Sequence, residues 1–421
     1  MLTLFARHLG SVIPTTLAIL LVTAAGHAQI PCAYEVTAVI QGPWCPIFGF
    51  PPTFGRGITE DGAVVGSYNS CVIGPSEAFY WSESTGFVTL DRPPDSVGAA
   101  AADIDENGTI AGTLTYQEFG PNGKNEWNVA AMWETLDAQP IELGIPPKGT
   151  DSFGAAIDQG QVVGYWANFN TGPLHGFVYE GGVMTDLGPD LGTPSSRAND
   201  IKKGKVVGWM GKGFLQDGQA YIWDSGQVIP LANPRDMFSG RAHGISPNGR
   251  WVVGAAQLDD GTMFGSTRAL LWITGEVIEL GTLPGFLRSG ASDVTDTEMI
   301  IGSAWGPGAA SAGIIWYNGL LLDLNSLIPP ESAVEVTAAA AINSAGQITA
   351  LGHNTSGDVV ALVLTAVGGP VGDLDGDCQV GILDLLSLLS EWGPCNGCPA
   401  DLDGYGHVGI IDLLILLANW G

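Results

Sequence analysis

The stretch GITEDGAVVG at residues 57–66 is the first of seven copies of one pattern. In each copy, small residues and an Ile or Val precede a turn, and a β-branched run that usually ends in glycine follows. The later copies are DIDENGTIAG (103–112), AIDQGQVVG (156–164), DIKKGKVVG (200–208), GISPNGRWVVG (244–254), DVTDTEMIIG (293–302) and AINSAGQITA (341–350). Turns such as EDG, ENG and PNG between β-branched runs predict hairpins.

The spacing of the copies predicts a unit of four strands. The residues that end them lie 44 to 52 residues apart, and they are Gly66, Gly112, Gly164, Gly208, Gly254, Gly302 and Ala350. This period is too long for one coil of a parallel β-helix and suits a propeller blade. We interpret the glycines as marks of a bulge or a close backbone approach rather than as a phosphate cradle.

A second segment of each unit is a short apolar strand, usually ending in an aromatic residue. The equivalent positions are Trp81, Trp133, Tyr179, Trp223, Trp272, Trp316 and Leu364. One large side chain per unit fills the space between stacked blades, which we favour over a ligand-binding role. The fold class is therefore mainly β, a seven-bladed β-propeller over residues 29–365.

The seventh unit lacks its fourth strand, because the chain runs from VVALVLT into AVGGPVG. The segment YEVTAVI at residues 34–40 precedes the first unit and has the alternation of a strand. We expect this N-terminal strand to complete the last blade and close the ring without an open sheet edge.

The body resembles the HAF-repeat family of bacterial extracellular proteins, whose units pair a turn-VVG segment with a strand similar to His-Ala-Phe. His175-Gly176-Phe177 is the best copy of that strand, and Ala78-Phe79 and Ala220-Tyr221 match it in part. The resemblance covers most of the chain. It implies an extracellular protein and no established activity.

The C-terminal segment contains two copies of a 21-residue repeat, DLDGDCQVGILDLLSLLSEWG (373–393) and DLDGYGHVGIIDLLILLANWG (401–421). Acidic residues at positions 1, 3 and 12 have the spacing with which a loop wraps oxygens around calcium. The predicted ligands are Asp373, Asp375, Asp377, the carbonyl of Gln379 and Asp384 in the first loop, and Asp401, Asp403, the carbonyl of His407 and Asp412 in the second. Tyr405 replaces the carboxylate of position 5, which predicts a weaker second site.

This segment resembles a type I dockerin, a small α-helical module of duplicated, EF-hand-like calcium loops, and would form a domain at 373–421 after a linker at 366–372. The resemblance implies aspartate at position 12 and glycine where Cys378 stands. It also implies a cohesin-like or cell-surface partner, selected at positions 10 and 11, which here are the aliphatic Ile382, Leu383, Ile410 and Ile411. The leucines that follow each loop predict two short helices that pack on each other, so that calcium binding is coupled to folding.

The charge balance excludes two classes of partner. The formal net charge of -28 would repel nucleic acid and anionic membranes alike. Residues 1–28 have the charged, apolar and small-residue regions of a signal peptide, with an apolar run too short to span a bilayer. We therefore expect a secreted chain that begins near Gln29, without a transmembrane segment.

Six cysteines in an exported chain favour disulfides. They form two groups, Cys32, Cys45 and Cys71 near the start and Cys378, Cys395 and Cys398 near the end. We expect one bridge in each group, with the pairing open. A zinc site formed by Cys378, Cys395, Cys398 and His407 is the alternative.

The loops after the second and fourth strands of each unit are long and share one face. They carry the aromatic residues Tyr68, Tyr116, Phe119, Trp127, Tyr165, Trp166, Phe169, Trp209, Phe214 and Trp305. Such rings offer stacking faces to sugars, so the favoured function is a binding or cell-surface interaction protein with an extended ligand such as a glycan. The alternative is a polysaccharide-active enzyme, a hydrolase or lyase. A hydrolase needs two carboxylates at a set separation, and the patterned ones are Asp103, Asp200 and Asp293.

Overall fold

The computed structural model describes residues 31–46, 49–70, 76–120, 123–169, 172–212, 218–259, 266–308, 310–317, 319–395 and 397–421. The signal peptide expected at residues 1–28, Cys71 and Phe214 lie outside these residues. No helix in the described part of the chain has the length and apolar character needed to cross a membrane.

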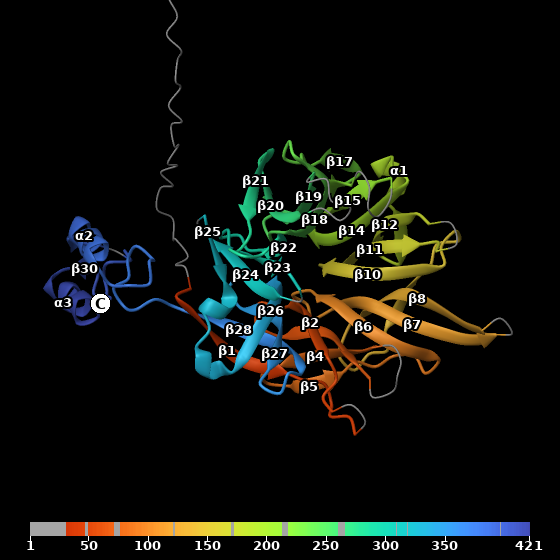
Figure 1. Cartoon of the computed structure of the whole chain (residues 1–421), viewed down its shortest axis with the longest axis horizontal. Helices are drawn as coiled ribbons and strands as arrows, with labels where there is room; N and C mark the ends of the chain where they lie inside the picture. The colour runs from red at the N-terminus through yellow and green to blue at the C-terminus, as the bar shows by residue number, and fades with distance from the viewer. Residues whose placement is uncertain are drawn as a thin grey trace, which may run out of the picture.

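Seven antiparallel sheets of four strands surround a central axis and confirm the seven-bladed β-propeller (Figure 1). The first three are β2 (Thr53–Ile58), β3 (Val64–Asn69), β4 (Ser76–Ser82) and β5 (Gly86–Thr89); β6 (Ser96–Ile104), β7 (Ile110–Gly120), β8 (Gly123–Trp133) and β9 (Ile141–Gly144); and β10 (Asp151–Asp158), β11 (Gln161–Ala167), β12 (Leu174–Glu180) and β13 (Val183–Asp186).

The next three sheets follow the same order. They are β14 (Ser195–Lys202), β15 (Lys205–Gly211), β16 (Gln219–Asp224) and β17 (Gln227–Pro230); β18 (Met237–Ile245), β19 (Trp251–Leu258), β20 (Thr267–Ile273) and β21 (Glu276–Gly281); and β22 (Arg288–Val294), β23 (Ile300–Trp305), β24 (Ser311–Tyr317) and β25 (Leu320–Asp323). Short helices at α1 (Gly188–Leu191), Leu324–Ser326 and Pro330–Ser332 lie in the connections.

The seventh sheet combines the two ends of the propeller. Its strands are β26 (Val334–Ile342), β27 (Ile348–Asn354), β28 (Val359–Val367) and, as the outer strand, β1 (Ala33–Ile40). β1 pairs antiparallel with β28 from Ala33 opposite Val367 to Ile40 opposite Ala361. The N-terminal strand therefore lies beside the last repeat.

The glycine that ends six of the seven repeats permits a close backbone approach, as predicted. A Cβ at Gly66, Gly164 or Gly208 would lie 1.9 Å from a carbonyl oxygen of the neighbouring inner strand. The inner strand has a β-bulge at the same level in every blade, for example between Gly154 and Ala156. The bulge bends the inner strand toward the second strand of the blade. Glycine is required at the point of approach because it has no side chain there.

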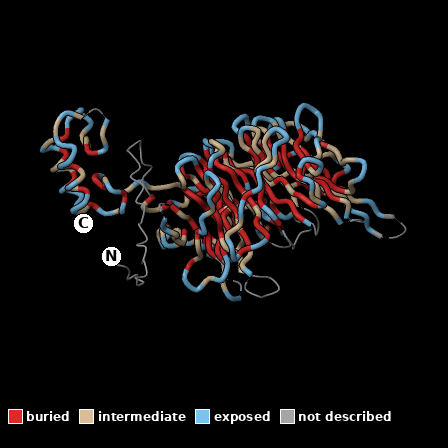
Figure 2. Tube along the Cα trace, turned by 90° about the horizontal axis from the view of Figure 1, so that it is seen from above, coloured by how far each residue is buried: buried red, intermediate tan, exposed pale blue. Residues whose placement is uncertain are grey.

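The repeated aromatic residues fill the space between blades. Trp133 is fully buried, and its Nε1 donates to the carbonyl of Asp91 at 2.7 Å. Trp272 makes the equivalent bond to Ala232, also at 2.7 Å. Buried residues run through every blade, whereas the connecting loops are exposed (Figure 2).

The C-terminal segment forms two helices, α2 (Ile382–Ser390) and α3 (Ile410–Ala418), beside the short pair β29 (Gly393–Pro394) and β30 (His407–Val408). Its small core includes Val380, Leu388, Val408 and Leu416. The two helices contact each other, as expected, and Leu385 and Leu413 pack against the same core. The outer leucines of both helices are exposed.

The disulfides confirm the bridge expected in the C-terminal group, where Cys395 pairs with Cys398. The remaining cysteine of that group, Cys378, pairs with Cys32 and so joins the two groups. All three cysteines of the alternative zinc site are therefore oxidised, and that site is excluded. Cys71 lies outside the described residues, so the bridge expected in the N-terminal group stays a prediction.

Candidate functional site

The bulges of the inner strands supply side chains to the propeller axis. Each bulge adds one residue that has no partner on the second strand of its blade. Such a residue is freed from the alternation of the strand, and bulges often serve to re-aim a side chain in this way. Five bulge residues line one cavity: Arg56, Ala102, Ala155, Asn199 and His243.

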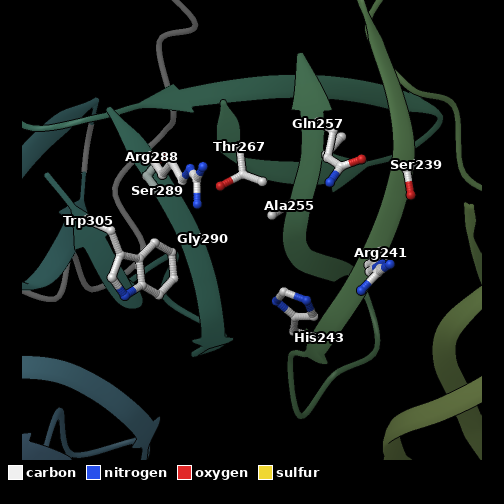
Figure 3. A pocket seen from close by; sticks show the side chains of 11 residues that line it. Ser239, Arg241, His243, Ala255, Gln257, Thr267, Arg288, Ser289, Gly290 and Trp305 are labelled. Carbon is white, nitrogen blue, oxygen red and sulfur yellow. The ribbon is translucent and has the colours of Figure 1, made fainter. Parts of the chain in front are cut away.

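This axial cavity has a volume of about 500 Å³, and its chemistry comes from six side chains. They are Arg56, Phe153, Tyr165, Arg197, Asn199 and His243. A second cavity of about 460 Å³, the side cavity, lies between the fifth and sixth blades and contains Arg241, His243, Gln257, Arg288 and Trp305 (Figure 3). His243 lines both cavities, so they adjoin at this residue.

The two cavities concentrate positive charge in an acidic protein. The chain has 43 Asp and Glu against 15 Lys and Arg, yet none of the described residues lining either cavity is acidic. Four arginines line them instead. Within the described part of the chain, neither Arg56 nor Arg197 forms an ion pair. This arrangement attracts anions, because several cations share a partly enclosed space without a carboxylate.

Aromatic rings hold the arginines in place. The guanidinium of Arg197 lies 4.4 Å from the ring centroid of Tyr165, which stacks on Phe153 at 4.7 Å. Burial lowers the pKa of Arg197, and burial followed by the charge of Arg197 lowers the pKa of Arg241. Both remain charged at neutral pH because an arginine pKa starts above 12. The Nε of Arg197 is buried and has no described hydrogen-bond partner.

His243 has a defined protonation pattern. Its Nδ1 lies 2.9 Å from the carbonyl oxygen of Ala291. A carbonyl only accepts, so Nδ1 donates and Nε2 is the acceptor of the neutral ring. Burial, and then the charges of Arg241 and Arg197, lower the pKa of His243 below its usual value, whereas the bond to Ala291 opposes them. The imidazole is therefore neutral at pH 7.

The patterned carboxylates lie elsewhere and link blades together. Asp103, Asp200 and Asp293 accept the backbone N–H of Ile157, Ile245 and Ile342 in the next blade, at 3.0, 2.8 and 3.0 Å. They sit near the hairpin ends of the inner strands. Burial raises the pKa of each to about 6, and the charge of Lys202 opposes that shift. None of them lines either cavity, and the described lining residues include no carboxylate pair for hydrolysis.

The described long-loop aromatics differ in exposure, and Trp127 and Tyr165 are half-buried. Tyr68, Tyr116, Trp166 and Trp209 are buried, so the expectation that they offer stacking faces is wrong for them. Trp166, for example, stacks on His175 with ring centroids 4.1 Å apart. Phe119, Phe169 and Trp305 are exposed, and Trp305 faces the side cavity from the side opposite Arg241 (Figure 3).

The acidic loops bring three carboxylates together in each copy. Side-chain oxygens lie within 4.8 Å of one another in two groups, Asp373, Asp375 and Asp384, and Asp401, Asp403 and Asp412. Asp384 and Asp412 at position 12 accept the N–H groups of Gly381 and Gly409, at 2.6 and 2.7 Å. Burial raises the pKa of both carboxyls, but these and other backbone hydrogen bonds outweigh it and lower the pKa overall. Ionised oxygens in close groups are the donors that calcium prefers.

The remaining predicted ligands lie around these groups. Asp377 is exposed, outside the close group, and accepts the N–H of Gln379 at 2.9 Å. His407 lies in β30 opposite Pro394. The sixth residue has a positive φ in both loops, 70° at Cys378 and 78° at Gly406, and its N–H donates to the first aspartate of its loop. The two copies therefore share a backbone conformation despite the cysteine.

Both helices of this module expose apolar side chains at equivalent positions. Ten of them are between 43% and 69% exposed: Ile382, Leu383, Leu386, Leu389 and Trp392, and their counterparts Ile410, Ile411, Leu414, Leu417 and Trp420. We call these ten residues the apolar helix surface. Exposed apolar surfaces of this kind are typical of interaction sites. Four residues of the apolar helix surface are the aliphatic residues at positions 10 and 11 of the loops, which the dockerin resemblance implies for partner selection.

No protein-family model matches the chain, and no curated protein matches it either. Solved structures with a similar arrangement include the β-propeller domain of the Trilobed protease from Pyrococcus furiosus, with 10% identity, a TM-score of 0.47 and coverage of 74% of this chain and 95% of that one. An acylaminoacyl peptidase from Pyrococcus horikoshii has 14% identity, a TM-score of 0.47 and coverage of 72% and 50%. An ulvan lyase, a polysaccharide lyase, has 13% identity, a TM-score of 0.43 and coverage of 81% and 96%. At these values the likeness concerns the fold.

Proposed function

We propose that this chain is a secreted binding protein whose propeller holds an extended anionic glycan in the axial and side cavities. One observation carries the proposal. Among the described residues, four arginines and no acidic residue line two adjoining cavities, in a chain of net charge -28. Elsewhere the acidic surface repels anions, so it favours entry of the ligand at this one place.

The side chains fit carboxylated or sulfated sugars. Arginine offers a planar fork of donors that matches a carboxylate or a sulfate, and charged hydrogen bonds are the strong ones. Tyr165, Phe153 and Trp305 add ring faces and edges for the sugar rings. Because His243 joins the two cavities, a ligand longer than one sugar would span both.

The C-terminal module would bind calcium and attach the protein to a cohesin-like or cell-surface partner. It has two clusters of three aspartates each, and carboxylate oxygens are ligands that calcium prefers. Calcium would neutralise the close carboxylates that begin and end each loop, and so hold α2 and α3 with the apolar helix surface outward. This proposal rests on the duplicated loops and on the exposed side chains at equivalent positions.

The hydrolase alternative lacks support at the cavities. A hydrolase needs two carboxylates flanking the glycosidic bond, and the patterned aspartates serve as links between blades. A lyase has no such requirement. Binding is the part of the proposal that both a carrier and a lyase share.

Affinity electrophoresis of the full-length protein in gels with acidic or neutral polysaccharides tests the propeller. We expect retardation by polyuronates or sulfated glycans, and little by neutral glucans. Arg197→Gln should weaken binding about tenfold or more, because a charged hydrogen bond contributes roughly 1.5 to 3 kcal/mol. Arg250, an exposed arginine that lines neither cavity, provides the matched control Arg250→Gln. Equal retardation by neutral and acidic glycans would contradict the proposal.

A further inference from the structure

We propose that His243 is a catalytic base that cleaves an acidic polysaccharide by β-elimination at the junction of the two cavities. The inference rests on the proposed binding of an anionic glycan and adds a reaction to it. The substrate class is a polysaccharide with a uronate linked through its C4 oxygen, because elimination needs a carboxylate next to the C5 proton and a leaving group on C4.

The position of His243 gives it access to a ligand in either cavity. It is the bulge residue of β18, and it lines both spaces. Its Nδ1 is bonded to Ala291, so Nε2 is the proton acceptor. Figure 3 shows its ring in the floor of the side cavity, beside Arg241 on the same strand.

A comparison with the preceding blade separates this role from a structural one. Asn199 is the bulge residue of β14, and its Nδ2 donates to the carbonyl of Ala242 at 2.6 Å. The bond from His243 to Ala291 is the same link, made one blade later. An amide is therefore sufficient to join neighbouring blades. What the imidazole adds is a second nitrogen that accepts a proton at neutral pH.

The arginines supply what such a base requires. A proton next to a carboxylate is a weak acid, because its removal places a second negative charge beside the first. Arg241 lines the side cavity together with His243, and Arg197 lines the axial cavity with it. After burial, the charges of these two arginines lower the pKa of His243. A uronate carboxylate held by these guanidinium groups would be neutralised, and the charge that develops on it during proton removal would be stabilised.

The reaction balances without water or an oxidant. Nε2 of His243 takes the C5 proton, and the electron pair of the C5–H bond forms a C4=C5 double bond. The C4–O4 bond breaks, and its oxygen leaves with the bonding pair. That oxygen takes a proton from the hydroxyl of Tyr165, which lines the axial cavity and keeps its proton at neutral pH because burial raises its pKa. Solvent then removes the proton from His243 and returns one to Tyr165.

The test is to incubate the full-length protein with polygalacturonate, polyglucuronate and alginate and to follow the ultraviolet absorbance of the conjugated C4=C5 product. We expect product from at least one of them. His243→Asn reproduces the residue of blade four and keeps a donor for Ala291, so it should fold normally. It should lower the rate about a hundredfold or more, as expected for loss of a positioned base, while binding stays within about threefold. Tyr165→Phe should lower the rate and keep binding.

The outcomes separate this inference from the proposed function. Binding of a polyuronate without any unsaturated product would overturn the elimination and leave the binding proposal intact. Absence of binding to every acidic glycan would overturn both. An unchanged rate in His243→Asn, or saturated reducing ends as the only product, would also reject the role of His243. If His243→Asn melts at a lower temperature, rescue of His243→Ala by added imidazole provides the second measurement, and failure of that rescue rejects the base.

Discussion

A disulfide joins Cys32, the residue before β1, to Cys378, the sixth residue of the first acidic loop, across 346 positions of the sequence. On one side, the N–H of Cys32 donates to the carbonyl of Val367 at the end of β28. On the other side, the N–H of Cys378 donates to Asp373 at 3.0 Å, and Asp373 lies 3.7 Å from the sulfur of Cys32. The first loop is thus covalently attached to the seventh blade through Cys378, whose N–H is bonded to the predicted calcium ligand Asp373.

This attachment predicts that calcium binding and the stability of the propeller are linked. Cys32→Ser with Cys378→Ser should lower the free energy of unfolding by about 2 to 4 kcal/mol, the usual contribution of a disulfide. The first loop should also bind calcium more weakly. Thermal unfolding with and without calcium and calorimetric titration of the full chain measure both effects.

The matched control is Cys32→Ser with Cys378→Gly. Cys378 has a φ of 70°, a conformation that costs a residue with a side chain about 1 kcal/mol more than glycine. The glycine variant should therefore bind calcium more tightly than the serine variant, although both lack the tether. Equal calcium affinities of the two variants would show that the backbone conformation at position 378 does not affect calcium binding.

The two loops should differ in affinity. Asp375→Ala should remove the tighter calcium site and Asp403→Ala the weaker one, because Asp377 has no carboxylate counterpart in the second loop. Tyr405→Asp should strengthen the second site about tenfold, and Tyr405 is 86% exposed, so this change disturbs no packing. Titration calorimetry of the full-length variants checks the ranking. An intact tight site in Asp375→Ala would reverse it.

The blades could be predicted from sequence because their determinants are local. Each unit contains its own hairpin turn, β-branched run and glycine. The glycine lies opposite a bulge in the adjacent strand of the same blade. The pairing of β1 with β28 joins the two ends of the propeller, and the sequence also predicts it, because the last unit lacks a fourth strand and one strand precedes the first unit.

The cationic cavities could not be predicted with the same means. Arg56, Arg197 and Arg241 come from three different blades, and no single repeat predicts that they line adjoining cavities. A local signal did exist: SRANDI at 196–201 and GRAHGI at 240–245 place an arginine two residues before a polar bulge residue. The pairing of Cys32 with Cys378 depends on where the tail lies against the ring, which no local pattern contains.

The strand β1 should be needed for a stable ring. Tyr34 on β1 is fully buried in the seventh blade, whereas Val39 on the same strand is 45% exposed. Tyr34→Ala should lower the free energy of unfolding by about 3 to 5 kcal/mol, and Val39→Ala should change it by less than about 0.5 kcal/mol. The hydroxyl of Tyr34 is buried without a described partner, so Tyr34→Phe should be neutral or stabilising. Chemical denaturation measures all three, and a small effect of Tyr34→Ala would show that the ring does not depend on this strand.

Lys202 should stabilise the propeller in a pH-dependent way. Burial raises the pKa of Asp103, Asp200 and Asp293 to about 6 from the ordinary 3.8, so the folded state binds protons more tightly than the unfolded chain. These three carboxyls therefore lose stabilising free energy as the pH rises through about 6, when they ionise while buried. Lys202 acts on all three, and its positive charge offsets part of that loss.

Lys202→Met should consequently lower the melting temperature more at about pH 8 than at about pH 5, where the carboxyls are mostly protonated. The matched control is Lys203→Met, since Lys203 is the next residue and its side chain is exposed. Because acidification also relieves the repulsion of a chain with net charge -28, the quantity to compare is the difference between variant and parent at each pH. A Lys202→Met effect that is equal at both pH values, or matched by Lys203→Met, would show that the three aspartates do not depend on this lysine.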